Sequence, residues 1–71
     1  MTVRELTQIA INPVTIIGAS TGKTLKRNVT TETLDNNPKL GALNLLGVQT
    51  ILLPDERFTC WVSETEYNAT K

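Results

Sequence analysis

The chain has 71 residues, of which seven are basic, seven are acidic and none is histidine, so its formal net charge is zero. This length predicts one small domain, near the lower limit for folding around a single core without crosslinks. The balanced charge argues against a field that attracts nucleic acid or an anionic membrane. The absence of histidine and the single cysteine argue against a zinc site and an intramolecular disulfide, and no residue pattern indicates a cofactor.

The composition favours a cytoplasmic protein with no membrane partner. A single cysteine fits a reducing compartment, and the charged N-terminus lacks the apolar segment of a signal peptide. No apolar run approaches the roughly 20 residues that a membrane-spanning helix needs. Hydrophobic residues make up 39% of the chain and aromatic residues 4%, so the core is aliphatic and modest, and oligomerisation would help to stabilise it.

The first expected element is a short helix that begins after Thr2. Thr2 and Glu5 have the spacing of a capping box, which satisfies two free backbone N–H groups at a helix start. Asn12 precedes Pro13 and therefore resists the helical conformation, so the helix should end near Ile11. A helix this short must dock on a sheet to be stable. Its expected apolar face consists of Val3, Leu6, Ile9 and Ala10.

Residues 14–28 predict a β-hairpin that turns at Ser20-Thr21-Gly22. Because Thr21 is β-branched and disfavours positive φ, we expect a three-residue loop with Gly22 in the left-handed position. The register that follows pairs Ile17 with Leu25 and places Ile16 beside Lys26 on the opposite face.

The same segment invites comparison with a phosphate-binding loop, since Gly18 follows a strand and Gly22-Lys23-Thr24 follows Gly18. That motif needs four residues between the first glycine and the Gly-Lys pair, whereas this chain has three. The residues after Thr24 also have a strand-like pattern, although the motif must open a helix whose N-terminus holds the phosphate. We therefore interpret the segment as a hairpin tip.

A basic cluster, Lys23, Lys26 and Arg27, occupies the second half of this hairpin. These residues could contact phosphate groups, so weak nucleic-acid or phosphate binding by the hairpin from Lys23 to Arg27 is the alternative function. No aromatic residues are interleaved with them, as single-strand binding would require. The favoured interpretation is an exposed edge strand that lysine protects against aggregation.

The connector over residues 29–46 is the least regular part of the chain. Thr31 to Leu34 could form one helical turn, which residues 35–38 would end. The leucines that follow should pack against the sheet, in a segment that is either helical or irregular.

Residues 47–63 predict a second hairpin, which holds the only Trp, Phe and Cys of the chain. Two β-branched and aliphatic runs, 48–53 and 58–62, flank a turn at Pro54-Asp55-Glu56-Arg57. The expected pairs are Leu53 with Phe58, Ile51 with Cys60 and Gln49 with Val62. Cys60 is then a core residue without an activating histidine, and we interpret it as an inert small hydrophobe.

This register predicts that both faces of the hairpin are partly apolar. Leu53, Ile51, Phe58, Cys60 and Val62 share one face, and Val48, Thr50, Leu52, Thr59 and Trp61 share the other. We predict an interface at Val48, Leu52 and Trp61, with Val14 and Ile16 as neighbours, because an exposed apolar patch usually marks a contact surface. The alternative is that residues 40–46 of the same chain cover this face.

Three local motifs follow one another in a recurring order. Thr2-Val3-Arg4-Glu5-Leu6 opens a helix, Ser20-Thr21-Gly22-Lys23-Thr24-Leu25 tips a hairpin, and Leu45-Leu46-Gly47-Val48-Gln49-Thr50-Ile51 leads into a second hairpin. In this order the chain resembles small uncharacterised proteins of Gram-positive bacteria and their prophages, over residues 2–63. Residues 36–43 are not part of that pattern. The resemblance implies a fold and a setting, and no activity.

The sequence thus predicts an α+β fold in one domain, residues 1–71. Two hairpins form an antiparallel sheet of about four strands, the N-terminal helix packs on one face, and residues 64–71 form a frayed polar tail. We expect no catalytic residues, because there is no histidine, no nucleophile–base pair and no metal-ligand set. The expected function is a non-enzymatic protein-interaction module whose partner is another protein, with self-association as one form of that interaction.

Overall fold

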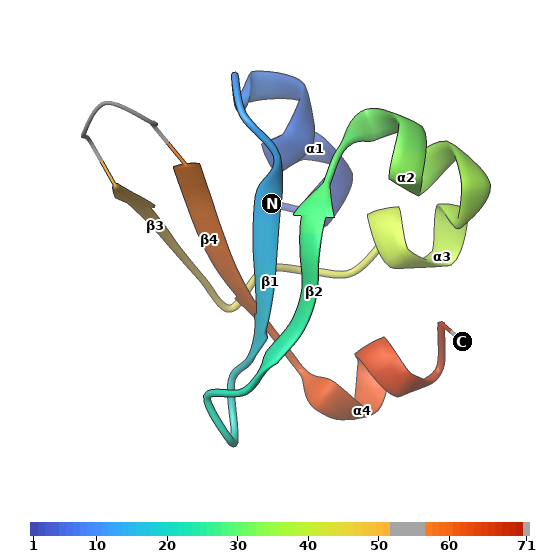
Figure 1. Ribbon diagram of the computed structural model, residues 1–71. Helices are drawn as coiled ribbons and strands as arrows, with labels where there is room; N and C mark the ends of the chain where they lie inside the picture. Colours follow the sequence, from blue (N-terminus) through green and yellow to red (C-terminus); the bar gives the residue numbers. More distant parts are fainter. Residues whose placement is uncertain (52–56, 71) are drawn as a thin grey trace.

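The computed structural model describes residues 1–51 and 57–70, and it confirms the α+β class (Figure 1). Helices cover one face of a four-stranded sheet, and the core lies between the two layers. In the described residues, the elements in chain order are α1 (Val3–Ile9), β1 (Val14–Gly18), β2 (Thr24–Val29), α2 (Thr31–Asn36), α3 (Pro38–Gly41), β3 (Gly47–Ile51), β4 (Arg57–Val62) and α4 (Glu64–Asn68).

The sequence predicted a purely antiparallel sheet, but the sheet is mixed. The strand order is β2-β1-β4-β3, and the two hairpins meet through a parallel pairing of β1 with β4. The parallel pairing results from the path of the connector, residues 29–46. β2 ends level with Val14, where β1 begins, but Gly47 of β3 begins level with the end of β1. The chain from α2 to β3 therefore crosses the helix-covered side of the sheet, so β3 runs in the same direction as β2.

Helix α1 begins with the predicted capping box. The Thr2 hydroxyl accepts a hydrogen bond from the Glu5 N–H at 3.2 Å, and the Thr2 N–H donates to the Glu5 carboxylate at 3.0 Å. The buried face consists of Val3, Leu6 and Thr7, whose hydroxyl donates to a carbonyl in the preceding turn. Ile9 was expected on this face but is 61% exposed, because it lies roughly a third of a turn away from Val3.

The first hairpin turns as predicted at Gly22, whose φ is +73°. Ile16 lies opposite Lys26 as expected, but Ile17 lies opposite Thr24 rather than Leu25. The register shifts twice along β2, and Asn28 has a φ of +56°. Asparagine is one of the few residues that tolerate this left-handed conformation, so it can accommodate an extra residue in the strand.

The connector is helical over most of its first half. Thr30 caps α2 through a reciprocal pair of hydrogen bonds with Thr33, and Pro38 begins α3, which the Asn37 side chain caps. The expected packing of the leucines after Pro38 is confirmed for Leu40 and Leu43, which are buried, and Leu45 packs partly buried against the core, but Leu46 is 65% exposed. Leu34 of α2 is also buried.

The second hairpin is present, but its predicted register is wrong. Cys60 lies opposite Val48 rather than Ile51, which is a shift of three residues. Phe58, Cys60 and Val62 still share one face, but the odd shift turns Val48 to the helix-facing side of the sheet and Gln49 to the opposite side. Leu53, Leu52 and most of the predicted turn at 54–57 lie outside the described residues.

The chain after Ser63 departs from the expected frayed tail, because Glu64–Asn68 form helix α4. The Tyr67 hydroxyl donates a hydrogen bond to the Leu25 carbonyl at 3.2 Å, and the Asn37 side chain donates to the Thr70 carbonyl at 3.4 Å. The second contact is long, but together they attach α4 to both β2 and α3.

The core between the helices and the sheet is aliphatic, as the composition predicted. It contains one or more side chains from α1, α2, α3 and three of the strands: Val3, Leu6, Val14, Ile16, Val29, Leu34, Leu40, Leu43, Cys60 and Val62.

Replacement of Leu34 by alanine should lower the free energy of unfolding by about 2–5 kcal/mol, because it removes a fully buried side chain and leaves a cavity. Ile11 is 83% exposed, and Ile11→Ala should change the same quantity by less than about 0.5 kcal/mol. Urea denaturation followed by circular dichroism measures both. Equal costs at the two positions would contradict this packing.

Candidate functional site

The face of the sheet opposite the helices carries a half-buried apolar pair. Ile17 of β1 lies beside Trp61 of β4 in the parallel register. The neighbouring row is polar and consists of Thr15, Thr59 and Gln49. The buried side chains of the described helices pack on the other face, so none of these helices covers Ile17 and Trp61. We call this surface the open face.

The predicted interface of Val48, Leu52 and Trp61 does not form one surface. Val48 lies opposite Cys60 and therefore shares the helix-facing side of β4, whereas Trp61 lies opposite Gly47 on the open face. Leu52 lies outside the described residues. The predicted neighbours Val14 and Ile16 are fully buried in the core.

Gly47 explains how Trp61 is held against the sheet. A Cβ atom built on Gly47 would lie 3.7 Å from Cε3 of the indole, in ordinary van der Waals contact. The ring therefore covers a position where the neighbouring strand has no side chain, and the Leu46 N–H donates to the Trp61 carbonyl at 2.8 Å. This arrangement fixes the start of β3 relative to β4.

The β3–β4 ribbon extends beyond the rest of the sheet (Figure 1). β1 pairs with β4 only from Thr59 to Val62, so the first residues of β4 have β3 as their neighbour in the described sheet. Val48 is 43% exposed and Leu46, just before β3, is 65% exposed. The described structure thus leaves apolar side chains uncovered along this side of the protein.

The basic cluster lies on the opposite edge of the sheet. Lys23 is in the hairpin loop, and Lys26 and Arg27 are exposed on β2. β2 is an edge strand, as the favoured interpretation of the cluster requires. Its register shifts and its charged side chains are both features that discourage pairing with another strand.

The loop that resembles a phosphate-binding loop already holds a carboxylate from its own chain. The Thr21 N–H donates a hydrogen bond to Oε1 of Glu64 at 2.9 Å. A Cβ on Gly18 would lie 2.5 Å from Cγ of Glu64, so only glycine leaves room for this side chain. Thr24 then begins a strand rather than a helix. A phosphate would meet a negative charge here, which argues against a nucleotide site.

The carboxyl group of Glu64 has a lowered pKa. A hydrogen bond from the Thr21 side chain is the main cause, and the Thr21 N–H, the Ser20 side chain and the charge of Lys23 act in the same direction. Sequence reasoning missed Glu64 because its partners lie more than 40 residues earlier in the chain, as its 43-residue separation from Thr21 shows.

Glu64→Gln should make the protein less stable near neutral pH. Because the pKa of Glu64 is lower in the folded state, the ionised carboxylate stabilises the fold above its ordinary pKa of 4.5. This stabilisation is lost as the pH falls through the lowered pKa, so the difference in melting temperature between the two proteins should shrink in acid. Melting curves from about pH 7 to about pH 3 measure it. Glu66→Gln, on the same helix, is the matched control, and parallel curves for Glu64→Gln and the unchanged protein would contradict the contact.

Cys60 is fully buried, and burial raises the pKa of its thiol to about 11. The thiolate is the nucleophilic form of cysteine, so this environment suppresses reactivity. The described residues contain no group of three or more histidine, cysteine or acidic side chains placed to hold a metal ion.

Cys60 should therefore react with a thiol reagent such as 5,5′-dithiobis(2-nitrobenzoate) at least about 100-fold more slowly in the folded protein than in urea, at about pH 8. Absorbance of the released thiolate gives both rates. A folded-state rate close to that in urea would show that Cys60 is accessible and ionisable.

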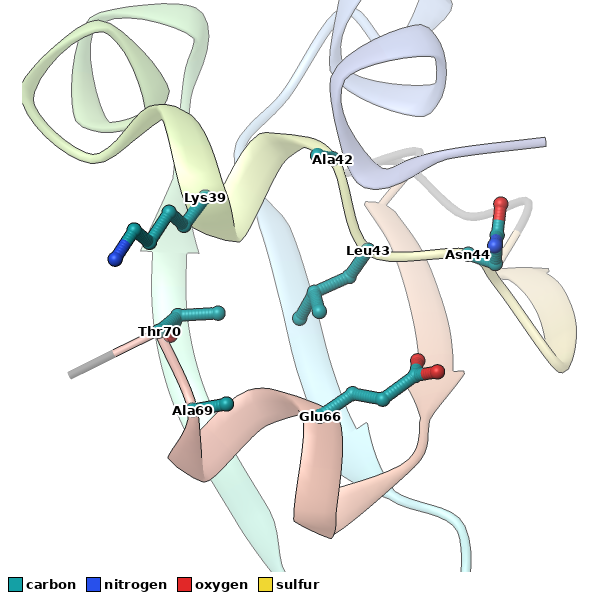
Figure 2. A pocket seen from close by; sticks show the side chains of 7 residues that line it. All are labelled: Lys39, Ala42, Leu43, Asn44, Glu66, Ala69 and Thr70. Atoms are coloured by element: carbon teal, nitrogen blue, oxygen red, sulfur yellow. The ribbon is translucent and has the colours of Figure 1, made fainter.

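A shallow groove of about 370 Å³ lies between α3 and α4 (Figure 2). The Leu43 side chain points into it, and Ala42 and Ala69 line it from the two sides. Lys39 and Glu66 supply its charges, but Figure 2 shows them pointing away from each other. They do not converge on a common point, so the groove lacks the paired polar groups that acid–base chemistry needs. The sequence did not reveal this groove because α4, which forms one wall, was not predicted.

None of the described helices is long and apolar enough to cross a membrane. Comparison of the chain with family models, with curated proteins and with solved structures gave no match.

Proposed function

We propose that this protein is a small, non-enzymatic interaction module that associates with itself. The observation that supports the proposal is the open face, where Ile17 and Trp61 lie side by side and no helix in the described part of the chain covers them. Tryptophan is enriched among the residues that contribute most of the binding free energy at protein interfaces. A partner that covered this pair would remove a large apolar surface from water.

The chemistry of the polar groups supports a binding role over catalysis. The only thiol is buried and held in its protonated form, and the carboxylate of Glu64 is engaged by the hairpin loop. The single cysteine also supports a reducing, cytoplasmic setting for this module.

Weak binding of nucleic acid by Lys23, Lys26 and Arg27 is the competing proposal. Thr24 of β2 lies next to Ile17, which lies next to Trp61, so the aromatic ring and the basic strand β2 are on the same sheet. Single-stranded nucleic acid binds to surfaces that combine aromatic and basic side chains. The zero net charge and the position of the cluster on a protected edge weigh against it.

Trp61→Ala should weaken self-association, raising the dissociation constant at least about tenfold, because it deletes the largest side chain of the open face. Sedimentation velocity over a range of protein concentrations measures the change. Trp61→Phe keeps an aromatic ring, so its dissociation constant should lie between those of Trp61→Ala and the unchanged protein. Ile11→Ala, at an exposed site outside the open face, should associate like the unchanged protein.

Two results would contradict the proposal. One is sedimentation as a monomer both before and after the substitution. The other is quenching of the Trp61 fluorescence by single-stranded or duplex DNA, with a steep loss of affinity as salt increases, which would favour the nucleic-acid proposal.

A further inference from the structure

We infer that the outer edge of β3 pairs in antiparallel fashion with the β3 edge of a second copy, joining two four-stranded sheets into one. This inference rests on the proposed self-association and assigns its contact and its partner. The open face gives a reason to expect a partner, and the edge of the sheet gives the contact with it.

The two edges of the sheet differ in how well they could receive another strand. β2 has two register shifts, the left-handed residue Asn28 and the charged residues Lys26 and Arg27. β3 pairs with β4 through five successive residue pairs without a shift, and its sequence from Gly47 to Ile51 contains no charged residue and no proline. Irregularity and charge are the usual means by which proteins protect a sheet edge, and only β2 has them.

The charge pattern identifies a second copy as the partner. A strand that pairs antiparallel with itself places residue i opposite residue j and j opposite i, so a charge near the middle of the strand would lie close to its own copy across the two-fold axis. Gly47–Ile51 is free of this repulsion, and the zero net charge of the chain removes long-range repulsion between copies.

The exposed apolar residues along this edge would gain cover in the dimer. Val48 and Leu46 are among the most exposed large hydrophobic residues of the described chain, and both lie in or beside β3. Trp61 reaches the same edge, because its ring lies against Gly47. Antiparallel pairing within one sheet relates the copies by a two-fold axis normal to the sheet, so both open faces would lie on the same side.

The length of the edge sets the expected affinity. Five residues of antiparallel strand extend about 17 Å, which is short for an interface between two proteins. We therefore expect a reversible dimer with a dissociation constant on the order of micromolar, typical of interfaces below the standard size.

The test introduces charge at Val48. Val48→Lys and Val48→Glu should each raise the dissociation constant at least about tenfold in sedimentation velocity from about 10 µM to about 1 mM, because each places like charges across the two-fold axis. Val48 is exposed at the sheet edge, so both variants should keep the circular dichroism spectrum of the unchanged protein. Ile11→Lys adds the same charge at an exposed site on another part of the surface and should leave association unchanged.

An equimolar mixture of Val48→Lys and Val48→Glu should associate again, because opposite charges then meet. This recovery would not occur if either substitution had merely damaged the fold. In the unchanged protein, hydrogen exchange at the amides of residues 47–51 should slow as protein concentration rises, since pairing protects the edge.

The outcomes separate this inference from the proposal beneath it. If Val48→Lys and Val48→Glu associate like the unchanged protein while Trp61→Ala does not, edge pairing is wrong. The proposal that the open face mediates self-association then remains supported. If the mixture does not recover association, edge pairing is likewise overturned. If the unchanged protein stays monomeric to about 1 mM, both proposals fail.

Discussion

The parallel pairing of β1 with β4 is the contact on which the rest of the structure depends. Each of the two hairpins alone would be a two-stranded ribbon, which is at best marginally stable in water. Their junction places Ile16 beside Cys60 in the core and Ile17 beside Trp61 on the open face. One pairing thus creates both the buried side of the protein and the surface to which we assign its function.

The parallel direction also decides where the helices lie. Parallel neighbours in a sheet cannot be joined by a tight turn, so the chain must return across one face before the second hairpin begins. Here α2, α3 and the segment up to Leu46 make that return, and their leucines complete the core with α1. The segments that make this return lie on the helix-covered face, so they leave the second face uncovered. The half-buried apolar pair on that face is therefore a consequence of the topology.

Features that depend on neighbouring residues could be predicted from the sequence. The capping box of Thr2 and Glu5, the left-handed Gly22 and the shared face of Phe58, Cys60 and Val62 each follow from a few adjacent positions. Features set by distant segments could not. The register of β3 was misjudged because the pattern of residues 48–53 is apolar on both faces, so alternation does not identify the inward side.

Helix α4 was missed for a related reason. Residues 64–70 are polar and have no apolar stripe, so a helix there has no signal of its own in the sequence. Polar contacts to Thr21, Leu25 and Asn37, in three separate parts of the chain, attach it together with Tyr67, which packs partly buried against the core. The candidate site was predicted only in part for the same reason: Trp61 was identified, but its neighbour Ile17 depends on the parallel register.

Two glycines support our proposal that the open face, rather than the loop that resembles a phosphate site, carries the function. Gly18 leaves room for the side chain of Glu64, Gly22 adopts the left-handed conformation that the turn needs, and Gly47 lies beneath the ring of Trp61. Folding therefore accounts for Gly18 and Gly22 without a ligand. Folding does not account for Trp61, Val48 and Leu46, whose apolar surfaces remain partly in water. Exposure of this kind costs free energy in an isolated copy, and contact with another protein surface recovers it.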